Sequence, residues 1–349
     1  MKILDFLNQL IDDLPFNQNE SLSFQENVEV TQKKFLEKFN LVDEADLKLF
    51  LPLIPLRGIQ LTKKMLIHKF KLIHLNLNSA IEKYYDGKPA SAYQKIKKLL
   101  IHSKYSTHLS DAYQGFLLIK DFRAYNELHW YRLRELTAEE GINPEPSLLF
   151  HPPFEKRGKI KNFRFSISGF PCLYLGDSLN VCWKEINKKG NNNFASRLTF
   201  TGNQSFLRPL NITTPEPFTE AIYTNDQLNY EAFCFLITFP VIQLCLYKVK
   251  DVNVDNYFKP EYIISQLLMQ FVSEEGFFNS VIYSSTKEAD EKANHNLVLP
   301  IRIIAKSGFC TELKKNIKIT PPISVRTFDE ASLKDIENRL LCKEAVILI

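Results

Sequence analysis

The chain has 349 residues, of which 45% are hydrophobic and 24% charged, and its formal net charge is +4 at pH 7. These values are ordinary for a soluble globular protein, and the length is sufficient for two domains. The six cysteines include no Cys-x-x-Cys pair and the seven histidines show no metal-ligand spacing, so we expect reduced buried thiols and no metal.

The first residues argue against export. Three aspartates among the first 13 residues interrupt the apolar core that a secretory signal needs, and the segment has the pattern of an amphipathic helix. The longest apolar run, residues 232–247, is shorter than a membrane span and contains a proline. We therefore expect a soluble, cytoplasmic protein with no membrane partner.

Residues 1–123 are expected to form an all-helical N-terminal domain. Apolar residues recur at helical spacing from Ile3 to Leu14, and Pro15 ends that helix. The same periodicity predicts further helices over residues 28–39, around 47–50, and over 61–85, 90–102 and 110–123.

Charge is unevenly distributed within this region. Residues 1–48 carry ten acidic and five basic side chains (net −5), whereas residues 57–104 carry eleven basic and two acidic ones (net +9). The basic block either contacts the phosphates of a nucleic acid or is a solvated helix face beside the acidic helices. No zinc-finger, homeodomain or RNA-binding motif supports the first interpretation.

The second predicted domain, residues 124–349, mixes strands and helices without strict alternation, which indicates an α+β fold. A strand opening at Trp130 places Arg132 and Arg134 on one face. The proline-rich loop at 142–162 is interpreted as a lid or as a passive insertion. Further strands are expected at 196–201, 205–210, 244–249, 279–284 and 296–305, and helices at 261–272 and 332–341; residues 231–238 fit a helix or a buried strand.

The central stretch of the domain runs from Arg164 to Glu185. Apolar and polar residues alternate over 163–168, which predicts a strand, and Gly169 and Pro171 then supply a turn. The apolar residues 172–175 predict a buried second strand. Asp177-Ser178 is the expected N-cap of a helix that carries Glu185. On pattern alone these polar side chains are compatible with an ordinary domain.

The order and spacing of this stretch resemble the RES domain, a bacterial family of NAD-consuming toxins. Tyr131-Arg132 resembles the family's opening pair, and 283–285 and 296–299 resemble its closing Tyr-x-Ser turn and Asn-Leu-Val-Leu strand. The chain departs from the family pattern at Lys161-Asn162, where two glycines are usual, and at Ser284, where proline is usual. The central pattern is filled by Arg164, Phe165, Ser166, Gly169, Pro171, Tyr174, Leu175, Ser178 and Glu185.

This resemblance implies an ADP-ribosyltransferase-like pair of packed β-sheets with flanking helices, following the helical N-terminal domain. It also implies roles for individual residues in binding and cleaving NAD. Glu185 would stabilise positive charge on the ribose as the nicotinamide–ribose bond breaks. Arg132 and Arg164 would bind the phosphates of NAD, and Tyr174 would stack on nicotinamide. Ser285 and Asn296 would orient the ribose or the nicotinamide amide. The alternatives are structural: salt bridges, a core tyrosine, a turn-capping serine and an exposed helix glutamate.

The expected function is therefore a NAD-consuming enzyme, a NAD glycohydrolase or phosphorylase acting as a toxin, with NAD as substrate. A protein mono-ADP-ribosyltransferase is the alternative within this chemistry, and a non-catalytic nucleic-acid-binding protein is the alternative of another class. The resemblance further implies an antitoxin or regulatory protein as partner. No Rossmann, P-loop or Gly-x-Ser-x-Gly motif supports a different enzyme class.

Overall fold

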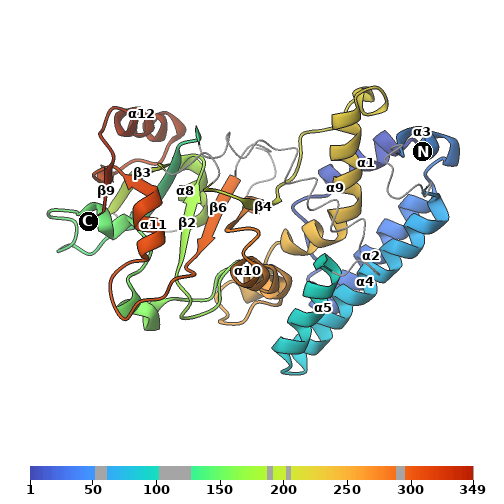
Figure 1. Cartoon of the computed structure of the whole chain (residues 1–349), viewed down its shortest axis with the longest axis horizontal. Coiled ribbons are helices and arrows are strands. Elements are labelled where there is room, and N and C mark those ends of the chain that lie inside the picture. Colours follow the sequence, from blue (N-terminus) through green and yellow to red (C-terminus); the bar gives the residue numbers. More distant parts are fainter. Residues whose placement is uncertain (52–60, 102–126, 187–191, 202–205, 288–294, 349) are drawn as a thin grey trace. The chain divides into compact units, whose positions relative to one another are not determined.

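The computed structural model describes residues 1–51, 61–101, 127–186, 192–201, 206–287 and 295–348. The chain divides into two compact units (Figure 1). One unit combines Met1–Lys120 with Thr213–Phe271, and the other combines Asp121–Ile212 with Val272–Ile349. The expected boundary near residue 123 lies outside the described residues. The structure differs from the expected contiguous division because Thr213–Phe271 packs with the N-terminal helices.

The described elements of the first unit are helices, and the helices predicted from residue 3, over 28–39, around 47–50, and over 61–85 and 90–102 are present. Ser23 and Glu26 form a capping box, which starts the second helix earlier than its apolar pattern indicates. The predicted helix at 110–123 lies outside the described residues. The helices are α1 (Ile3–Asp12), α2 (Phe24–Asn40), α3 (Glu44–Phe50), α4 (Lys63–Tyr85), α5 (Pro89–Ile101), α9 (Asp226–Cys245) and most of α10 (Ile263–Glu275), with short η3 (Glu220–Tyr223), η4 (Asp251–Asn253) and η5 (Pro260–Tyr262).

Helix α9 forms the centre of this unit. Every residue from Ala232 to Cys245 is buried, and Phe239 stacks on Phe35 of α2 with ring centroids 5.6 Å apart. Residues 231–238 are therefore helical, and the strand predicted at 244–249 is wrong. A segment that is apolar on all sides carries no period that distinguishes helix from strand. Among the described helices α9 is long and apolar enough to cross a membrane, yet 83% of its apolar 18-residue window is buried, as in a core helix.

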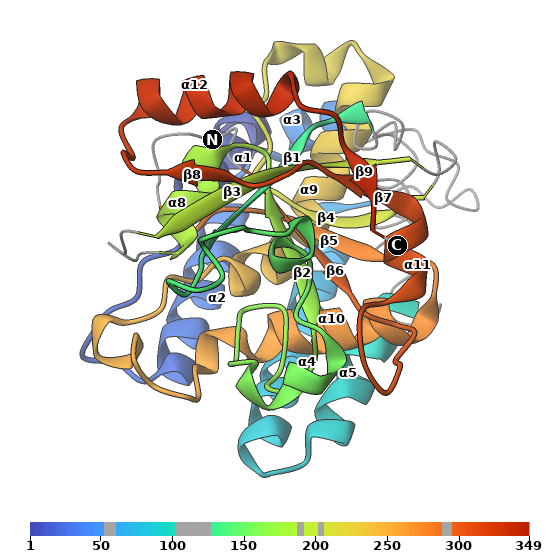
Figure 2. The same ribbon diagram turned by 90° about the vertical axis from the view of Figure 1, so that its left-hand side faces the viewer.

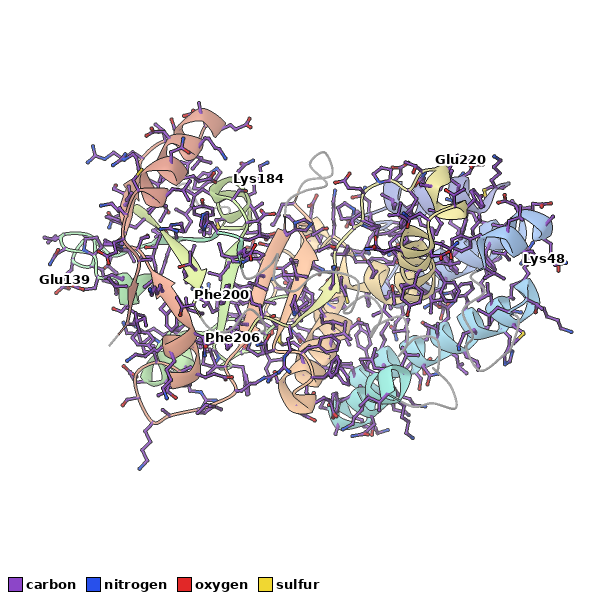
Figure 3. All side chains as sticks on the ribbon, turned by 45° about the horizontal axis from the view of Figure 1, so that its top comes forward. Lys48, Glu139, Lys184, Phe200, Phe206 and Glu220 are labelled. Carbon is purple, nitrogen blue, oxygen red and sulfur yellow. The ribbon has the colours of Figure 1, made fainter. Side chains whose placement is uncertain are left out.

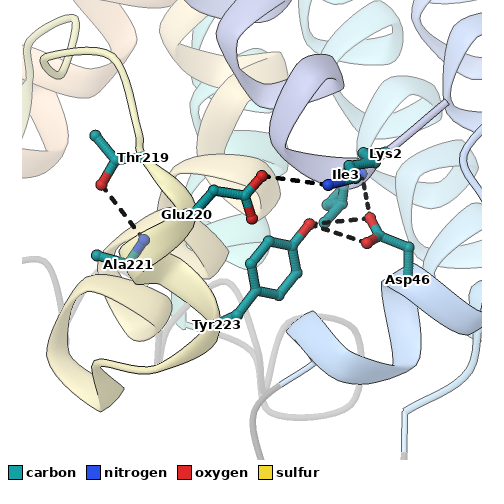
Figure 4. Close-up of polar contacts among 7 residues, drawn as sticks. All are labelled: Lys2, Ile3, Asp46, Thr219, Glu220, Ala221 and Tyr223. Atoms are coloured by element: carbon teal, nitrogen blue, oxygen red, sulfur yellow. Dashed lines mark hydrogen bonds and ion pairs between the residues drawn. The ribbon is translucent and has the colours of Figure 1, made fainter.

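A polar network attaches the segment before α9 to the N-terminal helices (Figure 4). The carboxylate of Asp46 accepts hydrogen bonds from the backbone N–H of Ile3 at 2.6 Å and from the hydroxyl of Tyr223 at 3.0 Å. Lys2 pairs with Glu220 at 3.2 Å. These contacts join α1, α3 and η3, which explains why residues far apart in the sequence fold as one unit.

The second unit is built on a nine-stranded sheet and confirms the α+β class. The strand order is β4-β5-β6-β2-β1-β3-β7-β9, with β8 also paired to β3, and β4–β5 is the parallel pair. Its strands are β1 (Trp130–Glu135), β2 (Cys172–Gly176), β3 (Asn193–Phe200), β4 (Pro209–Ile212), β5 (Ser280–Ser284), β6 (His295–Pro300), β7 (Ile317–Ile319), β8 (Ile323–Val325) and β9 (Val346–Ile347). Around it lie η1 (Pro146–Leu149), η2 (Phe154–Lys159), α8 (Leu179–Ile186), α11 (Thr311–Asn316) and α12 (Glu330–Leu341).

The described strands form one hydrogen-bonded network rather than the expected two separate sheets. The pairing between β1 and β2, near the middle of the sheet, is nonetheless short: it consists of a single residue pair, Tyr131 opposite Gly176. Beyond that pair the two strands separate. The sheet thus consists of β4-β5-β6-β2 on one side of this joint and β1-β3 with β7, β8 and β9 on the other.

Apolar residues cover both faces of the sheet. On one face Trp130, Leu173, Leu297 and Ile319 belong to a core shared by both halves. Phe200 and Phe206 meet at the edge of this core, with ring centroids 5.9 Å apart (Figure 3). On the other face of β1, β3 and β8, a smaller cluster packs under α8 and α12, and Figure 2 shows α12 alongside β8 and β3.

Two details of the sequence interpretation are corrected. Residues 163–168 form a tight turn and not a strand, since Phe163 and Ser166 pair across Arg164 and Phe165. Phe163 is 48% exposed while Phe165 is fully buried, so the apolar residues do not share a face as strand alternation requires. Strand β6 ends at Pro300, short of the predicted Ala305, because proline lacks the N–H for further pairing.

Candidate functional site

Glu185 lies in the last turn of α8, and the local fold fixes this helix. The chain leaves β2 at Gly176, where an added Cβ would lie 2.9 Å from the sulfur of Cys182. The hydroxyl of Ser178 then caps the helix by accepting the N–H of Val181 at 3.2 Å, as predicted. From α12, the Glu337 carboxylate accepts the N–H of Leu179 at 2.7 Å. The connection between β2 and α8 is therefore short, with close packing at Gly176 and hydrogen bonds at the start of α8.

The structure brings Glu185, Ser285 and Asn296 together from three separate elements. Oε1 of Glu185 accepts a hydrogen bond from the Ser285 hydroxyl at 2.8 Å and from the Asn296 amide at 2.9 Å. Ser285 and Asn296 are buried, and Glu185 is half-buried. Oε2 of Glu185 has no hydrogen-bond partner within the described parts of the chain. Among the described residues, one carboxylate oxygen is thus fixed and the other is not bonded.

Asn296 and Tyr174 share the sheet face opposite the main core. Their strand neighbours Leu297, Leu173 and Leu175 point into that core, and alternate residues of a strand point to opposite faces. The Tyr174 hydroxyl donates to Ser166 at 2.9 Å. Burial raises the pKa of Tyr174 well above its ordinary value, so this hydroxyl stays protonated.

Arg164 projects from the tight turn at 163–166. Arg164 is buried, with 8% of its surface exposed. Its guanidinium donates a hydrogen bond to the Thr286 hydroxyl at 3.1 Å. Thr286 directly follows Ser285, which holds Glu185. Arg164 is therefore bonded to the residue next to Ser285, and Ser285 is bonded to Glu185.

Arg132 occupies the place where β1 and β2 separate. Its guanidinium donates to the backbone carbonyl of Tyr174 at 3.1 Å, so it replaces a strand-to-strand hydrogen bond. Its Nε is buried without a hydrogen-bond partner among the described residues. Burial, and secondarily the charge of Arg134, lower the pKa of Arg132 to about 10, which leaves it charged at neutral pH. The Arg132 side chain is half-buried, and within the described chain it has no carboxylate partner.

All six residues expected from the sequence lie in the second unit. The structure brings Glu185, Ser285 and Asn296 into direct contact. The hydrogen bonds of the other three go elsewhere: Arg164 to Thr286, Tyr174 to Ser166, and Arg132 to the backbone of Tyr174. Sequence reasoning missed three residues that hold them: Thr286 on Arg164, Glu337 on α8, and the role of Ser166 as acceptor for Tyr174. Ser166 stands in the family-like pattern and Thr286 directly follows its serine, which were usable signals. Glu337 lies about 150 residues from α8 in sequence, and nothing local indicates its contact.

The chemistry available at this site is charge stabilisation and anion binding. Burial raises the pKa of Cys172 and of Cys182 to about 12, so neither thiol is a ready nucleophile. All six cysteines are free, five of them buried and Cys342 exposed. No cluster of three or more His, Cys, Asp or Glu side chains suited to a metal occurs among the residues that the structure describes. A fixed carboxylate can stabilise a cation, and two guanidinium groups can bind phosphates.

The basic block of the first unit shows both bonded and solvated lysines. Lys63 donates to the carbonyls of Asn40 at 2.8 Å and Val42 at 2.5 Å, and Lys83 and Lys88 pair with Asp86 at 3.7 Å and 3.4 Å. Part of this block, residues 57–60 and 102–104, lies outside the described residues. The contacts of Lys63 with the end of α2 are of the kind that the structural interpretation expects.

Comparison with known proteins gives one similarity. No protein-family model and no solved structure matches the chain. A protein of Bacillus subtilis (strain 168) named "Putative toxin YopC" is 29% identical over 282 residues. The match covers 75% of this chain and 60% of that relative, so this chain spans about 60% of the relative's length. The similarity suggests a toxin family, and membership of the RES domain family stays a prediction.

Proposed function

We propose that this protein is a toxin that consumes NAD by cleaving its nicotinamide–ribose bond. The observation that supports the proposal is the Glu185 carboxylate held by Ser285 and Asn296, since residues up to 111 positions apart in sequence converge on this one group. The name of the Bacillus relative supports the toxin role.

Glu185 is suited to stabilise a ribosyl cation. Breaking the nicotinamide–ribose bond places positive charge on the sugar, so a carboxylate beside it is stabilising mainly in the transition state. Two hydrogen bonds to Oε1 fix the carboxylate before the substrate binds, which reduces the reorganisation needed during the reaction. Oε2 is then the oxygen that would face the ribose.

The two arginines are suited to the diphosphate of NAD. Arg132 is a half-buried cation without a carboxylate partner in the described chain, and an anionic ligand would compensate that charge. Arg164 is held by Thr286, beside the serine that contacts Glu185. Charge-assisted bonds of this type contribute about 1.5–3 kcal/mol each.

Product analysis tests the proposal. Purified protein is incubated with NAD, with and without inorganic phosphate, and nicotinamide, ADP-ribose and ADP-ribose-1-phosphate are resolved. Nicotinamide with ADP-ribose indicates water as the acceptor, and ADP-ribose-1-phosphate indicates phosphate. Nicotinamide release only when a candidate protein is added supports the alternative, a protein mono-ADP-ribosyltransferase. If the wild-type protein releases no nicotinamide under any of these conditions, the proposed enzymatic activity is refuted.

Two further roles are proposed for the first unit. A toxin of this type needs an inhibitor, so the helical unit is a candidate for docking an antitoxin or regulatory protein. The competing non-catalytic role, nucleic-acid binding by the basic block, predicts affinity that falls steeply with salt. Binding that is absent or insensitive to salt would remove that competitor.

A further inference from the structure

Helix α4 of the first unit is attached through one row of apolar residues. Phe70 packs edge-on against Phe35 and Phe39 of α2, with ring centroids 4.9 and 5.1 Å apart. The helix also contacts α5 and α9 (Figure 1). The buried row follows alternating steps of four and three residues: Leu66, Phe70, Ile73, Leu77 and Ala80.

A second row with the same kind of spacing lies on the exposed side of α4. Steps of three, four and three residues join Met65, His68, Leu72 and Leu75. Leu75 is 65% exposed, Met65 is 41% exposed, His68 is exposed and Leu72 is half-buried. Two helices pack through positions spaced in this way, whereas a helix face in water is normally polar. This row therefore has the pattern of a packing face, yet the described part of the first unit leaves it exposed.

Two lysines flank the exposed row. Lys64 precedes Met65 and Lys71 precedes Leu72, at the positions where paired helices place the charges that select a partner. Both lysines are exposed, and neither has an ion-pair or hydrogen-bond partner among the described residues. No aspartate or glutamate occurs between residues 63 and 81, so α4 offers these lysines no carboxylate at helical spacing. The charge of this face is complementary to an acidic partner.

We propose that the exposed face of α4 is the docking surface for an acidic amphipathic helix of a partner protein. The apolar side of that helix packs on Met65, Leu72 and Leu75, and its carboxylates pair with Lys64 and Lys71. The phosphates of a nucleic acid would pair with the same lysines but leave the apolar row uncovered, so the row favours a protein. The docking does not depend on NAD cleavage. Only the role of the partner as an inhibitor of a toxin rests on the proposed function.

A synthetic peptide tests this docking without knowledge of the natural partner. The peptide has about 20 residues, long enough to form a helix, with leucines on one face and glutamates beside them. A second peptide of the same composition has its leucines scattered around the helix. Binding of each labelled peptide is measured by fluorescence anisotropy on the wild type, Lys71→Glu and Leu75→Ala.

Matched controls come from exposed positions elsewhere in the same unit. Lys34 of α2 is an exposed lysine without a bonded partner among the described residues, and Leu49 of α3 is 74% exposed. Lys34→Glu and Leu49→Ala should bind the amphipathic peptide within about twofold of the wild type. All four substitutions are at exposed positions, so thermal unfolding should show each variant as stable as the wild type within error.

The two α4 variants should bind the amphipathic peptide more weakly. We expect a loss of about 3- to 30-fold for Lys71→Glu, since an attractive charge pair becomes repulsive. For Leu75→Ala we expect about 5- to 30-fold, because apolar contact area is lost. The scattered peptide should bind the wild type at least about tenfold more weakly than the amphipathic one. Absence of peptide binding, or binding that is insensitive to Leu75→Ala, overturns the proposal.

Two other ligands and one activity assay complete the test. A DNA duplex that binds through Lys71 but independently of Leu75, or anionic lipid vesicles that bind where the peptide does not, would also overturn it. Nicotinamide release from NAD is measured on the same preparations. Peptide binding without nicotinamide release supports the docking surface and overturns the enzymatic activity, whereas nicotinamide release without peptide binding overturns the docking surface alone.

Discussion

At the scale of single residues, the site depends on how each charged group is held. Glu185 is bonded to two neutral donors, so its charge is oriented without being neutralised by a cation among the described residues. Arg132 is bonded to a backbone carbonyl, which fixes its position and keeps its charge. A neutral hydrogen-bonding partner positions an ion without compensating its charge, so a charged ligand can still pair with it. In a salt bridge the oppositely charged partner already compensates that charge.

Glu185→Gln should therefore separate binding from turnover. The amide keeps the shape of the carboxylate, so NAD affinity should stay within a few-fold of the wild type. Turnover should fall on the order of 10²–10³-fold, equivalent to about 3–4 kcal/mol, because the charge that stabilises the ribosyl cation is lost. Single-turnover release of nicotinamide, with NAD affinity measured on the same preparation, checks this.

The control for this variant is Glu139→Gln, at an exposed glutamate of the same unit that Figure 3 labels. It should match the wild type in stability and rate within error. Turnover by Glu185→Gln within a few-fold of wild type would show that Glu185 is only a helix residue.

At the scale of elements, α8 is positioned by a helix from the end of the sequence. Glu337 of α12 is 7% exposed and accepts the first N–H of α8. Trp183 of α8 stacks on Phe328, just before α12, with ring centroids 3.4 Å apart. A carboxylate at a helix N-terminus both satisfies an unpaired N–H and interacts favourably with the helix dipole. The C-terminal segment is thus a support for the helix that carries Glu185.

Glu337→Ala should lower the free energy of unfolding by about 1–3 kcal/mol, because it leaves the buried N–H of Leu179 without its acceptor. Urea denaturation measures this change. Asp335→Ala is a matched control on the same helix: its ion pair with Arg339 is exposed and 4.0 Å long, so about 0.5 kcal/mol or less is expected. Equal effects of the two substitutions would show that the contact between Glu337 and α8 contributes nothing specific.

At the scale of the whole molecule, the first unit is assembled from two distant stretches of sequence. Helix α9 belongs to the second stretch, is buried on all sides, and contacts α1 and α4 of the first. The N-terminal helices cover part of its apolar surface. We therefore expect Thr213–Phe271 to need Met1–Lys120 in order to fold.

A chain that lacks residues 1–120 should aggregate, since α9 would expose its apolar surface. Size-exclusion chromatography with light scattering measures this. A chain truncated after Lys343 is the control and should stay soluble, because the strand it loses, β9, is half-exposed and pairs with β7 at two positions. A soluble, folded monomer of residues 121–349 would show that the helical segment at 213–271 does not need its N-terminal partners.

The sequence by itself determined the local features of this protein. Amphipathic periodicity predicted α1 and α4, a cap at Ser178 predicted the start of α8, alternation predicted β1, and a short apolar run predicted β2. These local features are encoded within a few residues, by propensity and by pattern, so a single sequence is enough to predict them. The resemblance to the RES domain, and not the local pattern, selected Glu185, Ser285 and Asn296, which the structure brings into contact.

Only the tertiary structure decided the rest. Residues 163–168 alternate like a strand, yet Phe165 is drawn into the core at Tyr283, and burial of that ring overrides the local pattern. The assignment of Thr213–Phe271 to the N-terminal unit, the single joint between β1 and β2, and the support of α8 by Glu337 all depend on residues far apart in sequence. Such contacts are fixed by which apolar surfaces can cover one another, and that information is not local to any segment.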